Sequence, residues 1–211
     1  MDVSLTAVRQ ALTLPDFDVH SAWARMIPQS RRMRRPIEKP GNARQAGVLV
    51  LLYHHAGELT FVLTRRTDTL SSHSWQISLP GGRHEPQDDT TQETALREAC
   101  EEIGICTVLD VLCSLTPLYV NVSDFEVTPY VAYTADRPAF NIDPVEVAYV
   151  IEMPVRLLLD DTIKDREQWN LHGYDLDVPF YRYGEHVIWG ATAIMLSEFE
   201  GRLRTVMNTP T

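Results

Sequence analysis

The segment 81–105 constrains what this chain can fold into more than any other part of it. Gly81 and Gly82 open the segment, and Gly104 ends a stretch with helical periodicity. Three acidic side chains fall on one face of that helix: Glu98, Glu101 and Glu102. The opposite side carries an apolar stripe: Leu96, Cys100 and Ile103. The pattern predicts a helix that docks on a core with its back and presents carboxylates in front.

The acidic face of this helix requires an explanation. Like charges at i and i+4, as in Glu98 and Glu102, destabilise a helix by about 0.2–0.5 kcal/mol. Carboxylate oxygens are the hard ligands that Mg²⁺ and Mn²⁺ bind, with water and substrate phosphates completing the coordination shell. One interpretation is therefore a divalent-metal site formed by Glu98, Glu101 and Glu102. The alternative is an ordinary solvated helix face, which is what most acidic clusters are.

The segment resembles the signature of the Nudix hydrolase family, in which a glycine and an acidic loop precede the order Arg-Glu-hydrophobic-x-Glu-Glu-x-Gly-hydrophobic. Residues 97–105 match the second half of this signature, with the small Ala99 in the first hydrophobic position. In the first half, the family's acidic position falls on Asp89 and its glycine on Arg83. The loop after Gly82 is therefore one residue longer than in the commonest pattern.

The resemblance implies the fold class, an α/β/α sandwich with a mixed sheet, and the pattern of elements along the chain agrees with it. Residues 46–53 form an apolar run suited to a central strand buried on both faces, and residues 59–64 are expected to pair with it as a hairpin. Other elements are predicted in chain order: a helix at 4–12, strands at 108–118, 126–133 and 147–151, a helix from Pro154 through Leu159, and a strand leading into a final helix within 186–196.

Local signals also predict how the acidic helix is held. Thr90 or Thr91 is expected to cap its first turn, because a hydroxyl can accept a hydrogen bond from the free backbone N–H groups there. Glu93 is expected to pair with Arg97, four residues further along the same helix. Glu101 is a second partner for this arginine.

The sequence predicts three parts: 1–43, an N-terminal helix and basic arm; 44–200, the domain that resembles the Nudix family; and 201–211, a C-terminal tail. Seven basic residues and a single acid, Glu38, lie between positions 25 and 44. The basic residues are Arg25, Arg31, Arg32, Arg34, Arg35, Lys39 and Arg44. Prolines break the stretch, which favours an irregular surface linker paired with the acidic body over a contact with a phosphate-rich ligand or partner.

Composition excludes several classes of function. The formal net charge of −10 disfavours nucleic-acid binding. No apolar run is long enough for a membrane span and no export signal is visible, so we expect a cytoplasmic protein without membrane contact. Three scattered cysteines, Cys100, Cys106 and Cys113, favour reduced thiols over a disulfide framework or a zinc site. A homodimer is one oligomeric state that the sequence leaves open.

A second motif resembles the coenzyme A pyrophosphatase branch of the family, in which Leu-Leu-Thr-x-Arg-Ser/Ala leads through Arg and Gly to Phe-Pro-Gly-Gly. The matching residues are Leu63, Thr64, Arg66, Pro80, Gly81 and Gly82. The departures are Val62, Thr67, Ser71, Trp75 and Leu79. The missing arginine at Ser71 and the bulky Trp75 matter most, because they could change how the nucleotide or the pantetheine is held.

These resemblances imply roles for individual residues. Glu98, Glu101 and Glu102 would hold Mg²⁺ or Mn²⁺. Arg97 would steady a helix glutamate or the glycine loop without touching substrate, and Glu101 or Glu146 would be the general base. Three residues would serve substrate binding: Arg66 as a phosphate clamp, and Gly81 and Gly82 as a close backbone approach. His73 and His186 are weaker candidates, since a lone histidine is more often only hydrogen-bonded in place.

The implied function is hydrolysis of a pyrophosphate bond in a nucleoside diphosphate linked to another moiety. Coenzyme A or an acyl derivative is the leading substrate, giving 3′,5′-ADP and a phosphopantetheine. Alternatives are ADP-ribose, NADH or a dinucleotide as substrate, and a non-catalytic module that only binds nucleotides. The complete set of Glu98, Glu101 and Glu102 argues against the last, because binding alone needs no metal there.

Overall fold

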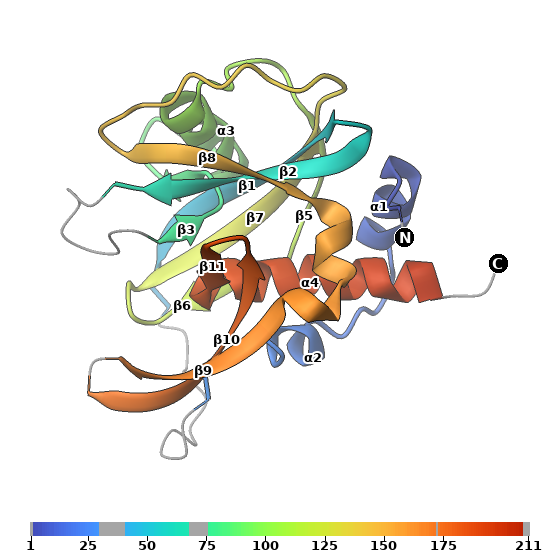
Figure 1. Ribbon diagram of the computed structural model, residues 1–211. Helices are drawn as coiled ribbons and strands as arrows, with labels where there is room; N and C mark the ends of the chain where they lie inside the picture. Colours follow the sequence, from blue (N-terminus) through green and yellow to red (C-terminus); the bar gives the residue numbers. More distant parts are fainter. Residues whose placement is uncertain (1, 30–40, 68–75, 172, 209–211) are drawn as a thin grey trace.

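The computed structural model describes residues 2–29, 41–67, 76–171 and 173–208, and an eight-stranded sheet lies at its centre (Figure 1). The strands are β1 (Arg44–His55), β2 (Glu58–Arg66), β3 (Ile77–Ser78), β4 (Gly81–Arg83), β5 (Asp110–Ser114), β6 (Leu118–Val120), β7 (Phe125–Tyr133) and β8 (Val147–Pro154). The main order is β3-β2-β1-β7-β5, with β4 on β1, β6 on β7 and β8 on β2. The sheet is mixed, because β1 runs parallel to β7 and antiparallel to β2.

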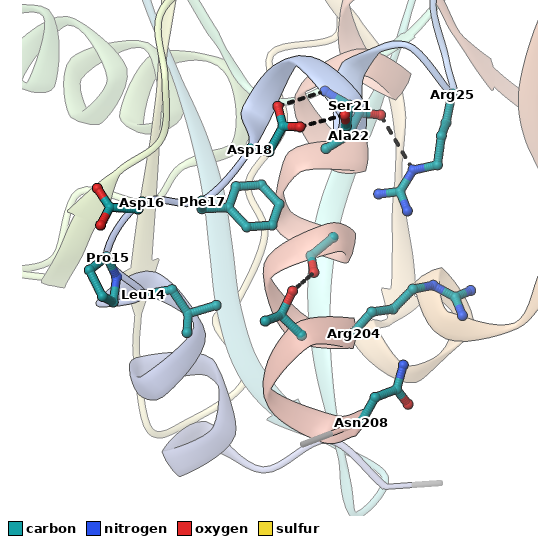
Figure 2. A pocket seen from close by; sticks show the side chains of 12 residues that line it. Leu14, Pro15, Asp16, Phe17, Asp18, Ser21, Ala22, Arg25, Arg204 and Asn208 are labelled. Carbon is teal, nitrogen blue, oxygen red and sulfur yellow. Dashed lines mark hydrogen bonds between the residues drawn. The ribbon is translucent and has the colours of Figure 1, made fainter. Parts of the chain in front are cut away.

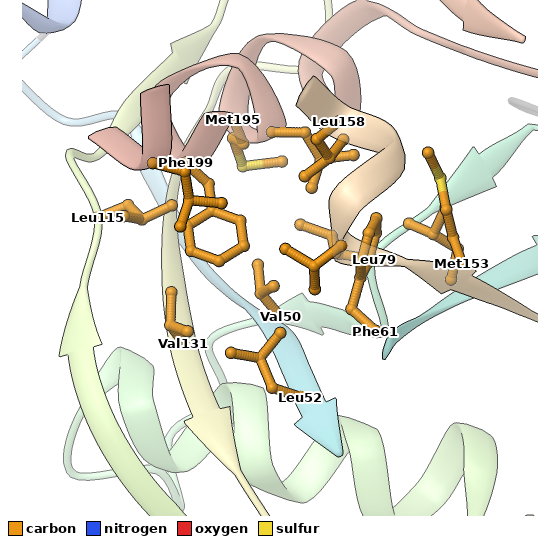
Figure 3. Close-up of a cluster of buried hydrophobic side chains, with 14 of the residues drawn as sticks. Val50, Leu52, Phe61, Leu79, Leu115, Val131, Met153, Leu158, Met195 and Phe199 are labelled. Carbon is orange, nitrogen blue, oxygen red and sulfur yellow. The ribbon is translucent and has the colours of Figure 1, made fainter. Parts of the chain in front are cut away.

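A helix covers each face of this sheet: α3 (Thr91–Ile103) on one and α4 (Gly190–Asn208) on the other (Figure 1). Alternate side chains of β1 supply the two cores. Leu49 and Leu51 pack with the buried side chains of α3, whereas Val50 and Leu52 pack with those of α4 (Figure 3). This confirms both the predicted sandwich and the predicted central strand, because period-two alternation sends neighbouring residues to opposite faces.

The remaining elements surround α4. Two N-terminal helices, α1 (Leu5–Leu12) and α2 (Val19–Trp23), pack against it. A separate antiparallel sheet has the order β11-β10-β9 and consists of β9 (Lys164–Leu171), β10 (Tyr174–Tyr183) and β11 (His186–Trp189). Two short 3₁₀ helices, η1 (Val155–Leu159) and η2 (Asp161–Ile163), precede β9. No helix in the described ranges is long and apolar enough to cross a bilayer.

The predicted elements at 4–12, 46–53, 59–64, 126–133, 147–151 and 186–196 are confirmed, and the helix predicted after Pro154 is the 3₁₀ turn η1. The single strand predicted over 108–118 is wrong, because the chain breaks into β5 and β6 around Pro117, which has no backbone N–H to donate. The helix α4 includes residues 201–208, which the sequence suggested were a tail. The basic residues between 30 and 40 lie outside the described residues.

Candidate active site

The acidic helix α3 is fixed at both ends by local geometry. The Thr90 hydroxyl accepts a hydrogen bond from the Glu93 backbone N–H at 3.1 Å, so Thr90 is the cap, and Thr91 instead bonds the Tyr130 hydroxyl at 2.8 Å. Gly104 ends the helix in the left-handed conformation with φ 77°. Gly47 of β1 lets the first turn of α3 approach closely, because a Cβ there would collide with the Thr91 carbonyl oxygen.

The side of α3 that faces the core differs from the predicted stripe. Ala95, Ala99 and Ile103 are fully buried, whereas Leu96 and Cys100 are only half-buried. The small side chains of the two alanines allow α3 to lie close to β1, and a leucine at this contact would hold the helix further away. Glu102 shares this orientation and is 3% exposed, so the three glutamates do not form an ordinary solvated face.

Asp88, which the sequence spacing did not indicate, is the acid that fixes Arg97. The Arg97 Nε and Nη2 atoms each donate to an Asp88 carboxylate oxygen at 2.9 Å, and the Thr94 hydroxyl donates to it at the same distance. The Arg97 guanidinium holds the pKa of this buried carboxyl well below its usual range. The longer loop after Gly82 was the available signal for Asp88. Counting back from Arg97 places the family's acidic residue at position 89, but the extra loop residue moves it to position 88.

The remaining contacts of Arg97 point to the glutamates and to the glycine loop. Its Nη1 atom donates to Glu98 at 3.0 Å and to Glu101 at 2.8 Å, and Nη2 donates to the Arg83 carbonyl at 3.1 Å. The expected contact with the helix glutamates is therefore present. The expected Glu93–Arg97 pair is wrong, since the Glu93 carboxylate accepts the backbone N–H of Asp89 at 2.7 Å.

Gly81 and Gly82 bring the backbone of β4 against two of the carboxylates. The Gly81 N–H donates to Glu102 Oε2 at 3.0 Å. A Cβ on Gly82 would lie 2.5–2.6 Å from the carboxylate atoms of Glu98, so any larger residue there would displace this carboxylate. Burial raises the pKa of Glu98 and raises the pKa of Glu102 to about 7. The glycine pair thus makes room for two carboxylates whose ionised forms are disfavoured.

Arg66, at the end of β2, lies beside Glu102 and Glu146. The Arg66 guanidinium lies 3.5 Å from Glu102 and 3.9 Å from Glu146. The backbone reinforces this arrangement, because the Thr67 N–H donates to the Glu146 carbonyl at 3.1 Å. Glu146 is 46% exposed, whereas Glu102 is buried, so the cluster reaches from the core to the solvent.

The structure therefore brings together the predicted site residues other than the two histidine candidates, in two linked groups. Arg97 and Glu101 lie at the outer side of α3, and Glu101 is 58% exposed. Arg66, Glu102 and Glu146 form the second group beside the glycine loop, with Glu98 between the two. His186, in β11, contacts the ring of Tyr149 and not a carboxylate of this cluster. Positions 71, 73 and 75 lie outside the described residues.

The donor set fits a hard divalent cation in its chemistry. Glu98 and Glu102 contribute carboxylate oxygens, and repulsion adds to the larger effect of burial on both. Glu101 and Glu146 raise the pKa of Glu98, and Glu98 and Glu146 raise the pKa of Glu102. A bound cation would relieve that repulsion. Within the described ranges, no three acidic, histidine or cysteine side chains already converge as metal ligands, and Arg66 supplies the positive charge beside Glu102.

The cysteines correct another expectation. Cys100 and Cys106 are joined by a disulfide, with their Cα atoms 4.5 Å apart, and Cys113 is free. The prediction of reduced thiols is therefore wrong for this pair. The physical reason is the left-handed turn at Gly104, which reverses the chain and returns Cys106 to the side of α3 that carries Cys100.

A cavity of about 500 Å³ lies elsewhere, between the α1–α2 connection, α2 and the end of α4 (Figure 2). Phe17 reaches from that connection toward α4, where Gly201 leaves space for its ring. Arg25 and Arg204 contribute charge to the wall. This cavity is lined by none of the predicted site residues, because α4 and α3 lie on opposite faces of the sheet.

Comparison with known proteins gives consistent results. The model of the NUDIX domain matches residues 43–169. "Nudix hydrolase 22, chloroplastic" of Arabidopsis thaliana is 38% identical over 161 residues, covering 72% of this chain and 53% of the plant protein, so the chain spans about half of that relative. "Uncharacterized Nudix hydrolase NudL" of Photorhabdus laumondii is 35% identical over 188 residues, covering 89% and 96%. The crystal structure of the Mycobacterium smegmatis Nudix hydrolase RenU shares the fold, with a TM-score of 0.52 at 17% identity, covering 80% of this chain and 89% of that one.

Proposed function

The chain belongs to the Nudix family, and on that premise we propose that it is a divalent-metal-dependent hydrolase of a pyrophosphate bond in a nucleoside diphosphate linked to another moiety. One observation carries the proposal. Glu102 and Glu146 flank Arg66, Glu98 lies against Gly82 beside them, and the pKa values of Glu98 and Glu102 are raised. Perturbed carboxylates of this kind are typical of catalytic sites.

Glu98 and Glu102, with Glu101 at the outer side, would hold Mg²⁺ or Mn²⁺, which when bound polarises phosphoryl oxygens and acidifies water. The chain's own residues prepare the site. Arg97, fixed by Asp88, sets the position of the Glu98 carboxylate, and the Gly81 N–H sets that of Glu102. Arg97 is therefore a positioning residue, and its bonds to Asp88 keep it away from substrate.

Arg66 and Glu146 are proposed to act on the substrate and the water. A guanidinium with 27% of its side chain exposed can exchange its long contacts to Glu102 and Glu146 for phosphate oxygens, which it binds in two-pronged geometry. Release from Arg66 leaves the exposed Glu146 free to accept a proton from the attacking water. Glu101 is the second candidate for the base, but its bond to Arg97 at 2.8 Å already occupies it.

Coenzyme A or an acyl-coenzyme A is the proposed substrate, giving 3′,5′-ADP and a phosphopantetheine. The two surviving halves of the branch motif support this choice, since β2 and β3 join them. The Thr64 hydroxyl lies 3.1 Å from the hydroxyl of Ser78, which is two residues before Pro80 and three before Gly81. Arg66 is thereby held at the same end of the sheet as the glycine loop.

The alternative proposal is a pyrophosphatase for ADP-ribose, NADH or a dinucleotide. The same carboxylates and Arg66 would serve it, because the diphosphate is common to all of these molecules. The departures at positions 71 and 75 favour this alternative, since they alter the stretch between the two halves of the motif.

A turnover assay with identified products tests the proposal. Purified protein is incubated with coenzyme A, acetyl-coenzyme A, ADP-ribose, NADH and a dinucleotide polyphosphate, each with Mg²⁺, with Mn²⁺ or with EDTA. We expect 3′,5′-ADP from the coenzyme A compounds, a rate that rises toward alkaline pH, and no turnover in EDTA. Full activity in EDTA would contradict the metal-dependent mechanism, and a tenfold preference for ADP-ribose or a dinucleotide would replace the substrate.

A further inference from the structure

The Cys100–Cys106 disulfide lies at the end of the helix that carries the site glutamates. Cys100 is two residues from both Glu98 and Glu102, and it is half-buried, whereas Cys106 is exposed. The bond closes a short loop around Gly104, the left-handed residue that ends α3. Cys113, in β5, has no part in this loop and is free.

The helix end that this loop encloses holds a second segment of the site. The Ile103 carbonyl accepts the Asn141 N–H at 3.0 Å, and the Glu102 carbonyl accepts the Asp143 N–H at 3.0 Å. The Asp143 carbonyl in turn accepts the Glu146 N–H at 3.2 Å. A chain of backbone hydrogen bonds therefore connects the turn closed by the disulfide to the residue that faces Arg66.

We propose that Cys100 and Cys106 are a reversible thiol–disulfide pair through which small thiols and disulfides control the neighbouring carboxylate site. Exposure of Cys106 gives a small thiol access to the bond, which is a main determinant of exchange. The effect of the pair on the rate of hydrolysis rests on the proposed function. The reversibility of the pair and its bracing of the helix end do not depend on that function.

The chemistry is ordinary exchange between thiols and a disulfide. In the reducing direction, the thiolate of a small thiol attacks one sulfur and breaks the Cys100–Cys106 bond, leaving a mixed disulfide and a thiolate that takes up a proton. A second small thiol displaces the first, so that two thiols become one small disulfide and the protein gains two electrons and two protons. Oxidation is the reverse, with a small disulfide such as oxidised glutathione as the oxidant.

Breaking the bond should loosen the end of α3. Opening a loop this short in a chain of this size lowers the melting temperature by about 4–8 °C. We expect kcat/KM to fall by about 2- to 30-fold in the reduced protein, the range in which mutations that alter coupling between sites act. The oxidised protein is the more active form, because its helix end holds Glu102 and the segment leading to Glu146 in place.

The experiment equilibrates the full chain across a series of reduced and oxidised glutathione ratios without oxygen. Alkylation followed by mass spectrometry measures the fraction of the pair that is oxidised, and scanning calorimetry measures the melting temperature of each form. Turnover is measured with acetyl-coenzyme A and Mg²⁺, because the free thiol of coenzyme A would itself reduce the pair. A separate arm replaces glutathione with coenzyme A and its disulfide, which shows whether the substrate's own thiol is the reductant.

Cys106→Ser is the test variant and Cys113→Ser is its matched control. We expect Cys106→Ser to behave like the reduced protein at every ratio, and Cys113→Ser to respond like the wild type. A pair that stays a dithiol at the most oxidising ratio, or stays a disulfide at the most reducing one, would overturn the proposal. Conversion with no change in melting temperature would overturn the bracing of the helix. Without any turnover of acetyl-coenzyme A the proposed substrate fails, and the mass and melting data still decide whether the pair is reversible.

Discussion

Two arginine–carboxylate groups each include one residue of α3, Arg97 in one and Glu102 in the other, and they behave in opposite ways. Arg97 binds Asp88 through two hydrogen bonds of 2.9 Å, and the pKa of Asp88 is well below its usual range. Arg66 lies 3.5 Å from Glu102 and 3.9 Å from Glu146, and the pKa of Glu102 is raised to about 7. The carboxylate of the first group is held by short hydrogen bonds, whereas the carboxylates of the second make only long contacts with their arginine.

The difference shows which group is structural and which is prepared for a ligand. Asp88 is satisfied by Arg97, by the Thr94 hydroxyl and by the Glu85 N–H, so its charge stabilises the fold. Glu102 is buried with the Gly81 N–H and a distant guanidinium, so its charge is poorly compensated. A carboxylate of that kind becomes favourable when a cation binds beside it.

The largest expected effect is on turnover in Glu98→Gln. The substitution removes one charge from the carboxylate that Arg97 positions and keeps its shape, so kcat should fall by about 10²- to 10³-fold at saturating Mg²⁺. The melting temperature should change little, because burial already disfavours the Glu98 charge. Steady-state kinetics and calorimetry measure both. The control is Glu93→Gln, an exposed glutamate on the same helix, and a near-normal rate in Glu98→Gln would contradict the metal-binding role.

The next effect is on stability in Asp88→Asn. Removing one partner of a fully buried ion pair costs about 3–5 kcal/mol, and we expect about 2–4 kcal/mol here because Arg97 keeps 20% of its side chain exposed. The free energy of unfolding in urea measures this loss. Asp89→Asn, one residue along and exposed, should change it by less than about 0.5 kcal/mol. Equal losses in the two variants would show that the Asp88–Arg97 pair does not hold this region.

Removal of Arg66 should affect substrate rather than fold. In Arg66→Ala, kcat/KM for coenzyme A should fall by about 10- to 150-fold, which corresponds to about 1.5–3 kcal/mol for a charged hydrogen bond. Arg66→Lys keeps the charge without the two-pronged geometry and should recover part of the loss. An unchanged kcat/KM in Arg66→Ala would mean that Arg66 serves only to neutralise Glu102 and Glu146.

The smallest effect is on the pH dependence of stability, measured by urea unfolding in metal-free buffer. The pKa of Asp88 is lower in the folded state, so its contribution is complete above its unfolded pKa of about 4 and is lost as the pH falls below it. The pKa of Glu102 is higher in the folded state, so its effect is favourable below about 4.5 and is lost as the pH rises toward about 7. Asp88→Asn should flatten the plot of unfolding free energy against pH at acidic pH. Glu102→Gln should flatten the same plot between about pH 4.5 and pH 7. The same curve in all three proteins would contradict both assignments.

The sequence determined the frame of this protein because its signals are local. Period-two alternation along residues 46–53 places a strand between two cores, and the hydroxyl of Thr90 and the conformation of Gly104 set the ends of α3. The spacing of Glu98, Glu101 and Glu102 is a property of any helix, so their neighbourhood was predictable. The β9–β10 hairpin was not predicted, since its mostly exposed β9 side chains give no apolar pattern.

Tertiary structure decided what each charge does. Sequence spacing gave Asp89 as the acid and Glu93 as the partner of Arg97, whereas the folded loop brings Asp88 to Arg97 and leaves Glu93 to the backbone of Asp89. The burial of Glu102 and the bond between Cys100 and Cys106 likewise depend on how α3 turns against β1 and how the chain reverses at Gly104. Helical periodicity fixes angles around one axis. The partner of a charge depends on distances between segments, and these exist only once the segments have packed.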